Sequence, residues 1–189
     1  MRVWEKEYNF NMKYFDELKK SMSFLGKKKN VIFIGQAVEY PGTAMYNTLT
    51  DIPSKKKYEL PVAEEMQMGI TIGLAMNGLI PVSIYPRWNF LLLSTNQIVN
   101  HLDKISKLGN GKFKQNIIIR TSIGSERPLH PSHQHVGDFT KEFSSMCKNI
   151  NFVKLREPKD IFPAYKKAFL CKDNKATVLV EYGDYYNEK

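Results

Sequence analysis

The chain has 189 residues, of which 42% are hydrophobic, and these values predict one globular domain long enough to bury a hydrophobic core. The formal net charge of +9 invites a nucleic-acid-binding hypothesis, but the lysines are scattered or form short runs such as residues 27–29 and 55–57, without interleaved aromatic residues. The cysteines, Cys147 and Cys171, match no metal or redox spacing, the chain opens without a signal peptide, and the apolar run 69–76 is too short to span a membrane, so a cytoplasmic protein is expected.

Helical and strand patterns alternate from the beginning of the chain. Residues 8–25 carry apolar side chains at helical spacing, which predicts an N-terminal helix. The continuous apolar run at residues 31–34 is typical of a strand that is buried on both faces. The loop that follows, residues 36–58, is long for a compact domain, and such loops are usually functional or disordered.

The central stretch, residues 60–90, predicts a loop, an apolar helix, a tight turn and a buried strand. Pro61 suits the first helical position, where its missing N–H costs nothing. Few residues of this helix are polar, so most of its faces are expected to be covered by protein. Gly69 and Gly73 share one face, and each costs about 1 kcal/mol relative to alanine in a helix. Close backbone approach is the expected reason for both glycines, and the Asn-Gly pair at residues 77–78 predicts the end of the helix.

The second half of the chain continues the alternation. Strands are predicted at residues 80–85, 117–119, 152–155 and 176–181, and helices at residues 91–108, 139–147 and 160–170. Strands that alternate with helices imply a parallel sheet covered on both faces. The predicted fold is therefore α/β, a three-layer αβα arrangement with a mainly parallel central sheet, in a single domain over residues 1–189 whose core spans about 30–182.

Candidate ligand-binding residues follow from this fold class. Ligands bind open α/β sheets outside the carboxyl ends of the strands. The loops expected there are residues 36–58, 86–90 and 121–138, and the last of them is polar and contains three histidines.

Several short motifs occur in an order and at spacings that are similar to those of one known family. They are Pro61-Val62-Ala63-Glu64 with Gly69 and Gly73 five and nine residues later, Asn77-Gly78-Leu79-Ile80-Pro81, Trp88-Asn89-Phe90, Asn96-Gln97-Ile98-Val99-Asn100 and Pro131-Ser132-His133-Gln134. The set resembles the pyrimidine-binding domain of thiamine-diphosphate-dependent enzymes, in the branch of transketolases and 2-oxoacid dehydrogenase beta subunits. This resemblance covers residues 30–182 and implies the thiamine-diphosphate-binding fold of the pyrimidine-domain type.

The resemblance implies roles for four side chains. Glu64 falls on the family's cofactor-activating glutamate, which shares a proton with N1′ of the aminopyrimidine ring, so it is expected to be both catalytic and cofactor-binding. Phe90 falls on the aromatic residue that packs against that ring, and the nearby Trp88 is grouped with it as cofactor-binding. His133 falls on a histidine near the reacting carbon, which implies a catalytic role as a proton donor or substrate contact.

Two departures from the family pattern imply that this chain holds half of an active site. The family holds Mg²⁺ and the diphosphate with Gly-Asp-Gly and a later Asn, whereas this chain has Gly137-Asp138-Phe139 and Gly183-Asp184-Tyr185. The chain also ends where a dehydrogenase beta subunit would continue into a further domain. The resemblance therefore implies thiamine diphosphate as the cofactor, no metal ligand on this chain, and Mg²⁺ on a separate diphosphate-binding subunit, within a homodimer or an α2β2-type heteromer.

The function implied by the resemblance is that of the pyrimidine-binding subunit of a two-chain thiamine-diphosphate-dependent enzyme. Such an enzyme makes or breaks a C–C bond next to a carbonyl of a small-molecule substrate, by 2-oxoacid decarboxylation or dehydrogenation or by ketol transfer. Two alternatives stay open: a non-catalytic dimerisation module that retains the fold, and a basic nucleic-acid-binding domain. The sequence identifies neither the acyl donor and acceptor nor the use of a lipoyl carrier.

The candidate site residues also have ordinary structural interpretations. Glu64 and Glu65 lie in the first turn of a predicted helix, where the helix dipole favours any carboxylate. Glu65 points about 100° away from Glu64 around the helix and is expected to be structural. Phe90 and Trp88 follow a buried strand, and aromatic residues at such positions often belong to the core.

The three histidines of the polar loop have a further interpretation. His130, His133 and His135 show a spacing that zinc ligands can adopt, although no cysteine accompanies them. The resemblance favours a catalytic role for His133 instead. The roles of His130 and His135 stay open.

Overall fold

The computed structural model describes residues 12–113, 115–124, 126, 130–171 and 173–186. The first helix, α1, spans Tyr14–Gly26. It confirms the helical pattern of the N-terminal stretch but begins later than predicted, and residues 8–11 of that prediction lie outside the described residues.

In the described part of the chain, six strands form one sheet in the order β2-β1-β3-β4-β6-β5. Every neighbouring pair is parallel, so all carboxyl ends lie at the same edge of the sheet. The predicted α/β fold with a parallel sheet is confirmed. The strands are β1 (Val31–Gly35), β2 (Lys57–Glu59), β3 (Ile80–Tyr85), β4 (Ile118–Ile123), β5 (Ile150–Lys154) and β6 (Ala176–Tyr182).

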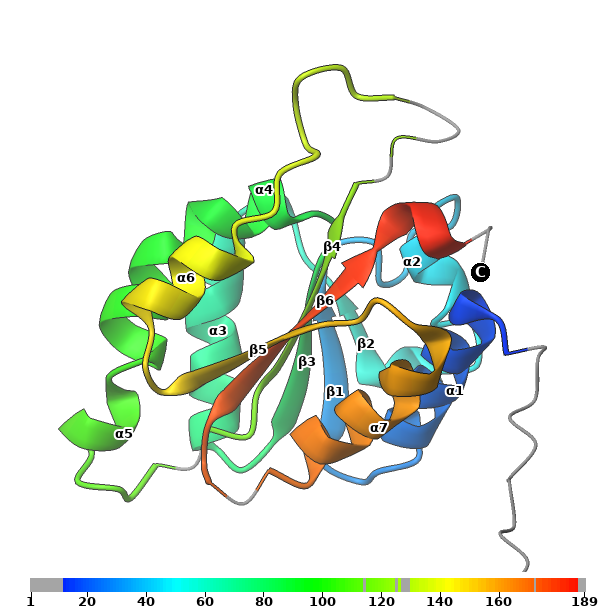
Figure 1. The fold of residues 1–189 in the computed structure, drawn as a ribbon. Helices are drawn as coiled ribbons and strands as arrows, with labels where there is room; N and C mark the ends of the chain where they lie inside the picture. Colours follow the sequence, from blue (N-terminus) through cyan, green and yellow to red (C-terminus); the bar gives the residue numbers. More distant parts are fainter. Residues whose placement is uncertain (1–11, 114, 125, 127–129, 172, 187–189) are drawn as a thin grey trace, which may run out of the picture.

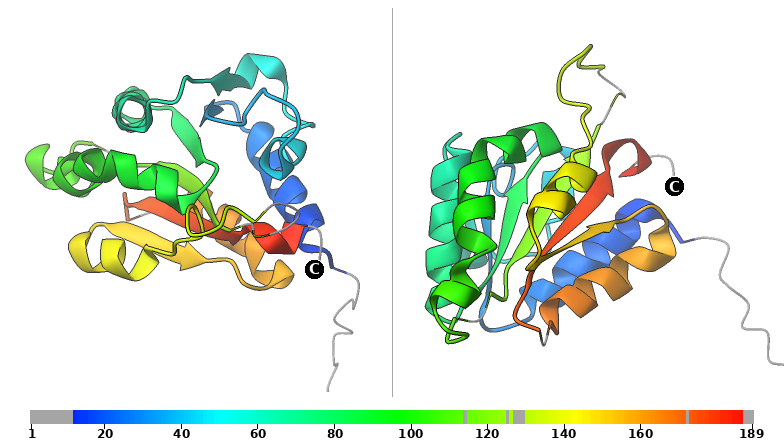
Figure 2. Two further views of the ribbon diagram at one scale, coloured as in Figure 1. Left: turned by 90° about the horizontal axis from the view of Figure 1, so that it is seen from above. Right: turned by 60° about the vertical axis from the view of Figure 1, so that its left-hand side comes forward.

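Helices cover both faces of this sheet (Figures 1 and 2). One face carries α1, α2 (Ala44–Asn47) and α7 (Pro158–Phe169), whose apolar side chains join a core with β1, β3 and β4. The other face carries α3 (Glu64–Met76), α4 (Trp88–Leu91), the π-helix η3 (Gln97–Leu102) and α6 (Thr140–Met146). Shorter helical turns are η1 (Ser54–Lys56), η2 (Leu92–Ser94), α5 (Ile105–Leu108) and η4 (Gly183–Tyr186).

Helix α1 illustrates how the sequence produces these layers. Its residues Tyr14, Leu18, Met22 and Leu25 recur at intervals of three or four and are completely buried. They form a single apolar stripe on the helix, which packs against the sheet and α7 while the lysines of α1 face outward. In α7 the buried residues also recur at intervals of three or four and form one buried face.

The structure corrects three predicted details of the local structure. The loop predicted over residues 36–58 contains α2 and the edge strand β2, whose Lys-Tyr-Glu sequence lacks an apolar run because an edge strand is partly exposed. The helix predicted at residues 91–108 is helical in the structure but irregular: it runs through α4, η2 and η3 to residue 102 and, after a turn at residues 103–104, continues as α5. Pro61 lies outside α3, which begins at Glu64 after the N-cap residue Ala63.

The glycines of α3 do not approach other parts of the chain. A Cβ atom built on Gly69 or Gly73 would meet no atom within 4 Å, so close backbone approach within this chain is the wrong explanation. The same face exposes the apolar side chains Met66, Ile70 and Met76, with exposed fractions of 46%, 37% and 46%. The predicted cover is therefore incomplete: one side of α3 is buried, and the face with Gly69 and Gly73 is open in the single chain. The turn that ends the helix has Gly78 at φ +85°, as predicted.

A charged pair lies inside the core on the α1/α7 face. The fully buried Arg120 of β4 donates from Nε and Nη2 to the two carboxylate oxygens of Glu181 in β6, over 2.6 and 3.0 Å. The carboxylate also accepts hydrogen bonds from the hydroxyls of Tyr165 in α7 and Tyr186 in η4. Thr48 completes the arrangement, since its Oγ1 accepts from Arg120 Nη1 over 2.8 Å. One buried cluster thus ties β4, β6, α7 and η4 together.

Among the described residues, the structure has no helix that combines the length and apolar character needed to cross a membrane.

Candidate functional site

Glu64 is the first residue of α3 and lies at the edge of the sheet where the strands end. Its side chain is buried, with 3% of the residue exposed. Gln36, directly after β1, donates from Nε2 to Glu64 Oε1 over 3.1 Å. A buried carboxyl group at a helix N-terminus with one oxygen held by an amide can present its second oxygen, Oε2, to a ligand.

Two hydroxyl groups fix the backbone at Glu64. Ser94 donates from Oγ to the carbonyl oxygen of Glu64 over 2.6 Å, and the Tyr85 hydroxyl reaches the same oxygen over 3.4 Å. Burial raises the pKa of Tyr85 well above its usual value, and the nearby Glu64 charge adds to this effect, so the hydroxyl stays protonated and can donate. The position of Glu64 is thus tied to the end of β3 and to η2.

A close approach of the backbone occurs at Gly35 rather than at the helical glycines. Gly35 ends β1 with φ +136°, and a Cβ atom there would lie 2.2 Å from the carbonyl oxygen of Ile84 and 2.5 Å from Gln67 Nε2. The buried Gln67 amide occupies this space and donates to Ser83 Oγ and to the Ile84 carbonyl. Glycine is required because any side chain would displace α3 from β1 and β3.

The loop after β1 is held by a second glutamate. Glu59 of β2 accepts hydrogen bonds from three successive backbone N–H groups, those of Ala37, Val38 and Glu39, over 2.9, 2.7 and 2.7 Å. Ala37 adopts φ +58°, which helps to turn these N–H groups toward one carboxylate. Glu59 thereby fixes the chain immediately after Gln36, the residue that contacts Glu64.

Phe90 and Trp88 take different positions in α4. Phe90 is partly exposed, and its ring lies against the ring of His135 with 5.0 Å between the ring centroids. Trp88 is completely buried and packs against Phe139 and Phe143, and its Nε1 donates to Thr140 Oγ1 over 3.2 Å. The structure therefore places Phe90 against His135, and Trp88 in the core between α4 and α6.

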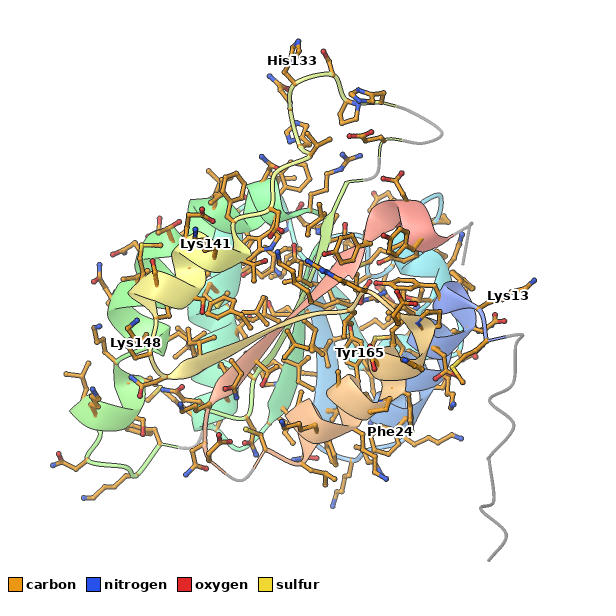
Figure 3. All side chains as sticks on the ribbon, viewed as in Figure 1. Lys13, Phe24, His133, Lys141, Lys148 and Tyr165 are labelled. Atoms are coloured by element: carbon orange, nitrogen blue, oxygen red, sulfur yellow. The ribbon has the colours of Figure 1, made fainter. Side chains whose placement is uncertain are left out.

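The structure separates the three histidines of the polar loop. His133 is exposed near the tip of the loop, which projects away from the sheet (Figure 3). His130 is also exposed, and its Nδ1 accepts from the Ser132 N–H. His135 instead lies against Phe90. Within the described ranges no group of three His, Cys, Asp or Glu residues is arranged to hold a metal ion, so the structure gives the zinc interpretation no support.

Sequence reasoning missed Gln36, Glu59 and Ser94. The position of Gln36 directly after an apolar strand was a usable signal, because side chains there lie at the ligand-binding edge of an α/β sheet. Glu59 and Ser94 gave no comparable signal, since each bonds to a backbone group whose direction is set by the folded chain. Glu65, expected to be structural, is exposed, and its Oε1 accepts from Asn96 Nδ2 over 3.2 Å.

A groove of about 900 Å³ lies elsewhere on the molecule. It is formed over β5 between α6 and α7, and its lining includes Phe152, Lys167 and Leu170. β5 is the edge strand at the end of the sheet opposite β2 and β1, and none of the lining residues belongs to the Glu64 cluster. The groove is therefore separate from the candidate site at Glu64.

Comparisons with known proteins give consistent results. The family model described as "Transketolase, pyrimidine binding domain" matches residues 17–187. The pyruvate dehydrogenase E1 component subunit beta of Gracilaria tenuistipitata var. liui is 28% identical over 180 residues, which cover 93% of this chain and 54% of that protein. The subunit of the same name from Cyanidium caldarium is 32% identical over 113 residues, covering 58% of this chain and 34% of that protein.

A solved structure shares the fold. The protein titled "Split gene transketolase, inactive beta4 tetramer" superimposes with a TM-score of 0.68 and 15% identity, over 89% of this chain and 50% of that one. The chain spans about half the length, or less, of the proteins that it matches.

Proposed function

The chain belongs to the transketolase pyrimidine-binding-domain family, and from this membership we propose that it is the pyrimidine-binding subunit of a two-chain thiamine-diphosphate-dependent enzyme. The enzyme would make or break a C–C bond next to a carbonyl, as in 2-oxoacid decarboxylation, dehydrogenation or ketol transfer. The observation that carries this proposal is the buried Glu64 carboxyl group at the carboxyl edge of the sheet, with Gln36 bonded to Oε1.

The residues present suit the aminopyrimidine half of the cofactor. A partly exposed aromatic ring, Phe90, offers a face for a heteroaromatic ring, and a buried carboxyl group, Glu64, offers an oxygen for a protonated ring nitrogen. Ser94 bonds to the Glu64 carbonyl four residues after Phe90, which ties the two elements together. When bound, thiamine diphosphate would supply the nucleophilic carbon and the electron sink of the reaction.

The chain's own contribution is to place and hold a proton. Glu64 Oε2 would share its proton with N1′ of the bound ring, while Gln36 keeps Oε1 oriented. Because the carboxyl group is buried, bulk water is kept away from this position. Tyr85, Ser94 and Glu59 fix the backbone so that the proton stays at one position.

The remaining site assignments are proposals of different kinds. We assign Phe90 to contact with the cofactor ring, and Trp88 to support of α4 through packing, since its ring has no exposed surface. We assign His133 to the substrate side of the reaction; its exposed position on the projecting loop lets it contact a substrate or a partner chain. Mg²⁺ and the diphosphate would be held by the partner chain.

Two free cysteines support a reducing, cytoplasmic location.

The exposed apolar face of α3 supports a partner chain at this site. Met66, Ile70 and Met76 line one side of the helix, Val62 just before the helix is also exposed, and Gly69 and Gly73 leave room for another backbone. Exposed apolar surface of this kind typically marks a protein interface. Because Glu64 begins the same helix, a partner bound to this face would lie next to the cofactor site, in a homodimer or an α2β2-type heteromer.

Replacing Gly69 and Gly73 together with leucine should separate the assembly without unfolding the chain. Both Cβ positions face open space, so the two leucines disturb no contact within the chain but would prevent close approach of a partner helix. Multi-angle light scattering should show a lower mass for the variant, with an unchanged circular dichroism spectrum. The matched control is Lys141→Leu with Ser145→Leu, which adds two leucines at the same spacing on the exposed side of α6. An unchanged mass of the glycine variant would place the interface elsewhere.

The binding of thiamine diphosphate tests the proposed function. The complex purified through a tag on this chain should bind thiamine diphosphate with Mg²⁺ in calorimetry and lose that binding when Mg²⁺ is chelated. The isolated chain should bind more weakly than about 1 μM, because it would lack the diphosphate ligands. Tight binding by the isolated chain would show that the diphosphate site is wrongly assigned. A complex that binds no cofactor would favour a non-catalytic dimerisation module.

A further inference from the structure

The segment that follows the projecting loop is fastened to the start of α4. Arg87 Nη1 donates to the carbonyl oxygen of His135 over 3.2 Å, and Asn89 Oδ1 accepts from the Gly137 N–H over 3.1 Å. The ring of Phe90 meets the ring of His135 at 5.0 Å between centroids, with 50° between their planes. His135 is thus held in place by its backbone on one side and by its ring on the other.

Two features of His135 are unfavourable for the stability of the folded chain. Its backbone adopts φ +63°, a conformation that is unfavourable for a residue other than glycine and that often accompanies a functional site. Its Nδ1 atom is buried and has no hydrogen-bond partner among the described residues. Burying a polar atom without a partner is unfavourable, so a buried unpaired atom calls for an explanation. In His135 the unpaired atom belongs to a ring that is packed on Phe90.

We propose that His135 is a ligand-binding residue: its Nδ1 forms a hydrogen bond with a polar edge atom of the heteroaromatic ring that packs on Phe90. The inference rests on the proposed function, in which that ring is the aminopyrimidine of thiamine diphosphate. A neutral imidazole nitrogen accepts or donates one hydrogen bond according to its tautomer, and an aminopyrimidine edge offers both an amino group and ring nitrogens. Arg87 and Asn89 are positioning residues that hold His135 against Phe90.

This assignment distinguishes His135 from its neighbours in the loop. His133 is exposed and projects with the loop tip, and His130 already uses Nδ1 to accept from Ser132. His135 combines contact with Phe90 and a buried nitrogen that has no hydrogen-bond partner in the described part of the chain. A role for His135 at the cofactor ring leaves His133 available for the substrate.

Nitrogen NMR of the imidazole rings tests the inference on the full chain. The chain has four histidines, so few signals must be assigned, and substitution of each histidine identifies its signal. Thiamine diphosphate with Mg²⁺, added at millimolar concentration, should shift the ring nitrogens of His135 and the backbone amide of Glu64. Shifts at Glu64 without a shift at His135, or with a shift at His133 instead, would overturn the inference and leave the proposed function standing. If the complex purified through a tag on this chain also shows no shift near Glu64, both the inference and the proposed function are overturned.

The affinity of variants gives a second measurement. His135→Phe keeps an aromatic ring against Phe90 but removes Nδ1, and it should weaken binding of thiamine diphosphate about three- to tenfold, as expected for one lost hydrogen bond. His101→Phe is the matched control, because His101 is exposed on η3, and its affinity should equal that of the parent. Asn89→Ala should weaken binding in the same direction and reduce the His135 shift. Parental affinity of His135→Phe, with a parental melting temperature, would overturn the inference.

Discussion

Replacing Arg120 with methionine should lower the free energy of unfolding by about 3–5 kcal/mol. Arg120 and Glu181 are fully buried, and their bidentate contact satisfies both carboxylate oxygens. Methionine fills much of the arginine volume but leaves the Glu181 charge without its partner in the core. Since a typical domain is stable by only about 5–15 kcal/mol, the variant should unfold at a much lower urea concentration.

The direction of the pKa changes supports this expectation. Burial alone would lower the pKa of the Arg120 guanidinium, but the Glu181 carboxylate outweighs that effect and holds the pKa above its usual value. Burial, together with Glu181, raises the pKa of the Tyr165 and Tyr186 hydroxyls, so both stay protonated and donate to the carboxylate. Tyr165 reaches this cluster from α7 (Figure 3). The four groups therefore form a hydrogen-bonded unit with no net charge. Removing the arginine leaves this unit with an unpaired negative charge in the core.

Two further variants separate charge from packing in this cluster. Arg156→Met removes an arginine that is exposed and bonded through Nε to the Tyr182 hydroxyl, and it should leave the unfolding midpoint unchanged. Adding Glu181→Gln to Arg120→Met removes the unpaired charge and keeps an acceptor for the two tyrosines, so part of the lost stability should return. A loss of less than about 1 kcal/mol for Arg120→Met would contradict the assignment of a buried charge pair.

The strands that could be predicted from the sequence are those that carry apolar runs, and they include the partly exposed edge strand β5. β1 is a continuous apolar run and β3 is apolar except for Ser83, because helices cover both strands on both faces. β2 was not predicted because it lies at the edge of the sheet and carries the charged residues Lys57 and Glu59 in place of an apolar run. The segment predicted as a helix at residues 91–108 is helical in the structure, as its apolar spacing indicates, but it is irregular: the 3-10 helix η2, the π-helix η3 and a turn at residues 103–104 interrupt the regular α-helix.

In the candidate site, too, some residues could be predicted from the sequence and others could not. Glu64 and Phe90 stand at the start of a helix and after the end of a strand, where sequence alone locates the ligand-binding edge. The partnership of Arg120 with Glu181, 61 residues apart, and the three N–H groups that Glu59 accepts depend on the folded backbone. Close backbone approach was predicted for Gly69 and Gly73, but within this chain no other segment approaches them, because their face is exposed.

Replacing Glu64 with glutamine should slow proton exchange at C2 of bound thiamine diphosphate by about 10²-fold or more, the usual range for losing a general acid–base group. Glutamine keeps the size of the side chain and can still bond to Gln36, so the fold and the cofactor pocket should survive. It cannot share a proton with N1′ of the ring. Because Glu65 is exposed and bonds instead to Asn96, Glu65→Gln is the matched control and should exchange like the parent.

Hydrogen–deuterium exchange at C2 of the bound cofactor, in the complex purified through a tag on this chain, is the most direct test of the role of Glu64. If Glu64 holds the proton shared with N1′, Glu64→Gln loses about 10²-fold or more in exchange rate, while its cofactor occupancy and melting temperature stay close to those of the parent. If Glu64→Gln exchanges as fast as the parent at equal occupancy, the carboxyl group is a helix-start residue and the catalytic assignment is wrong.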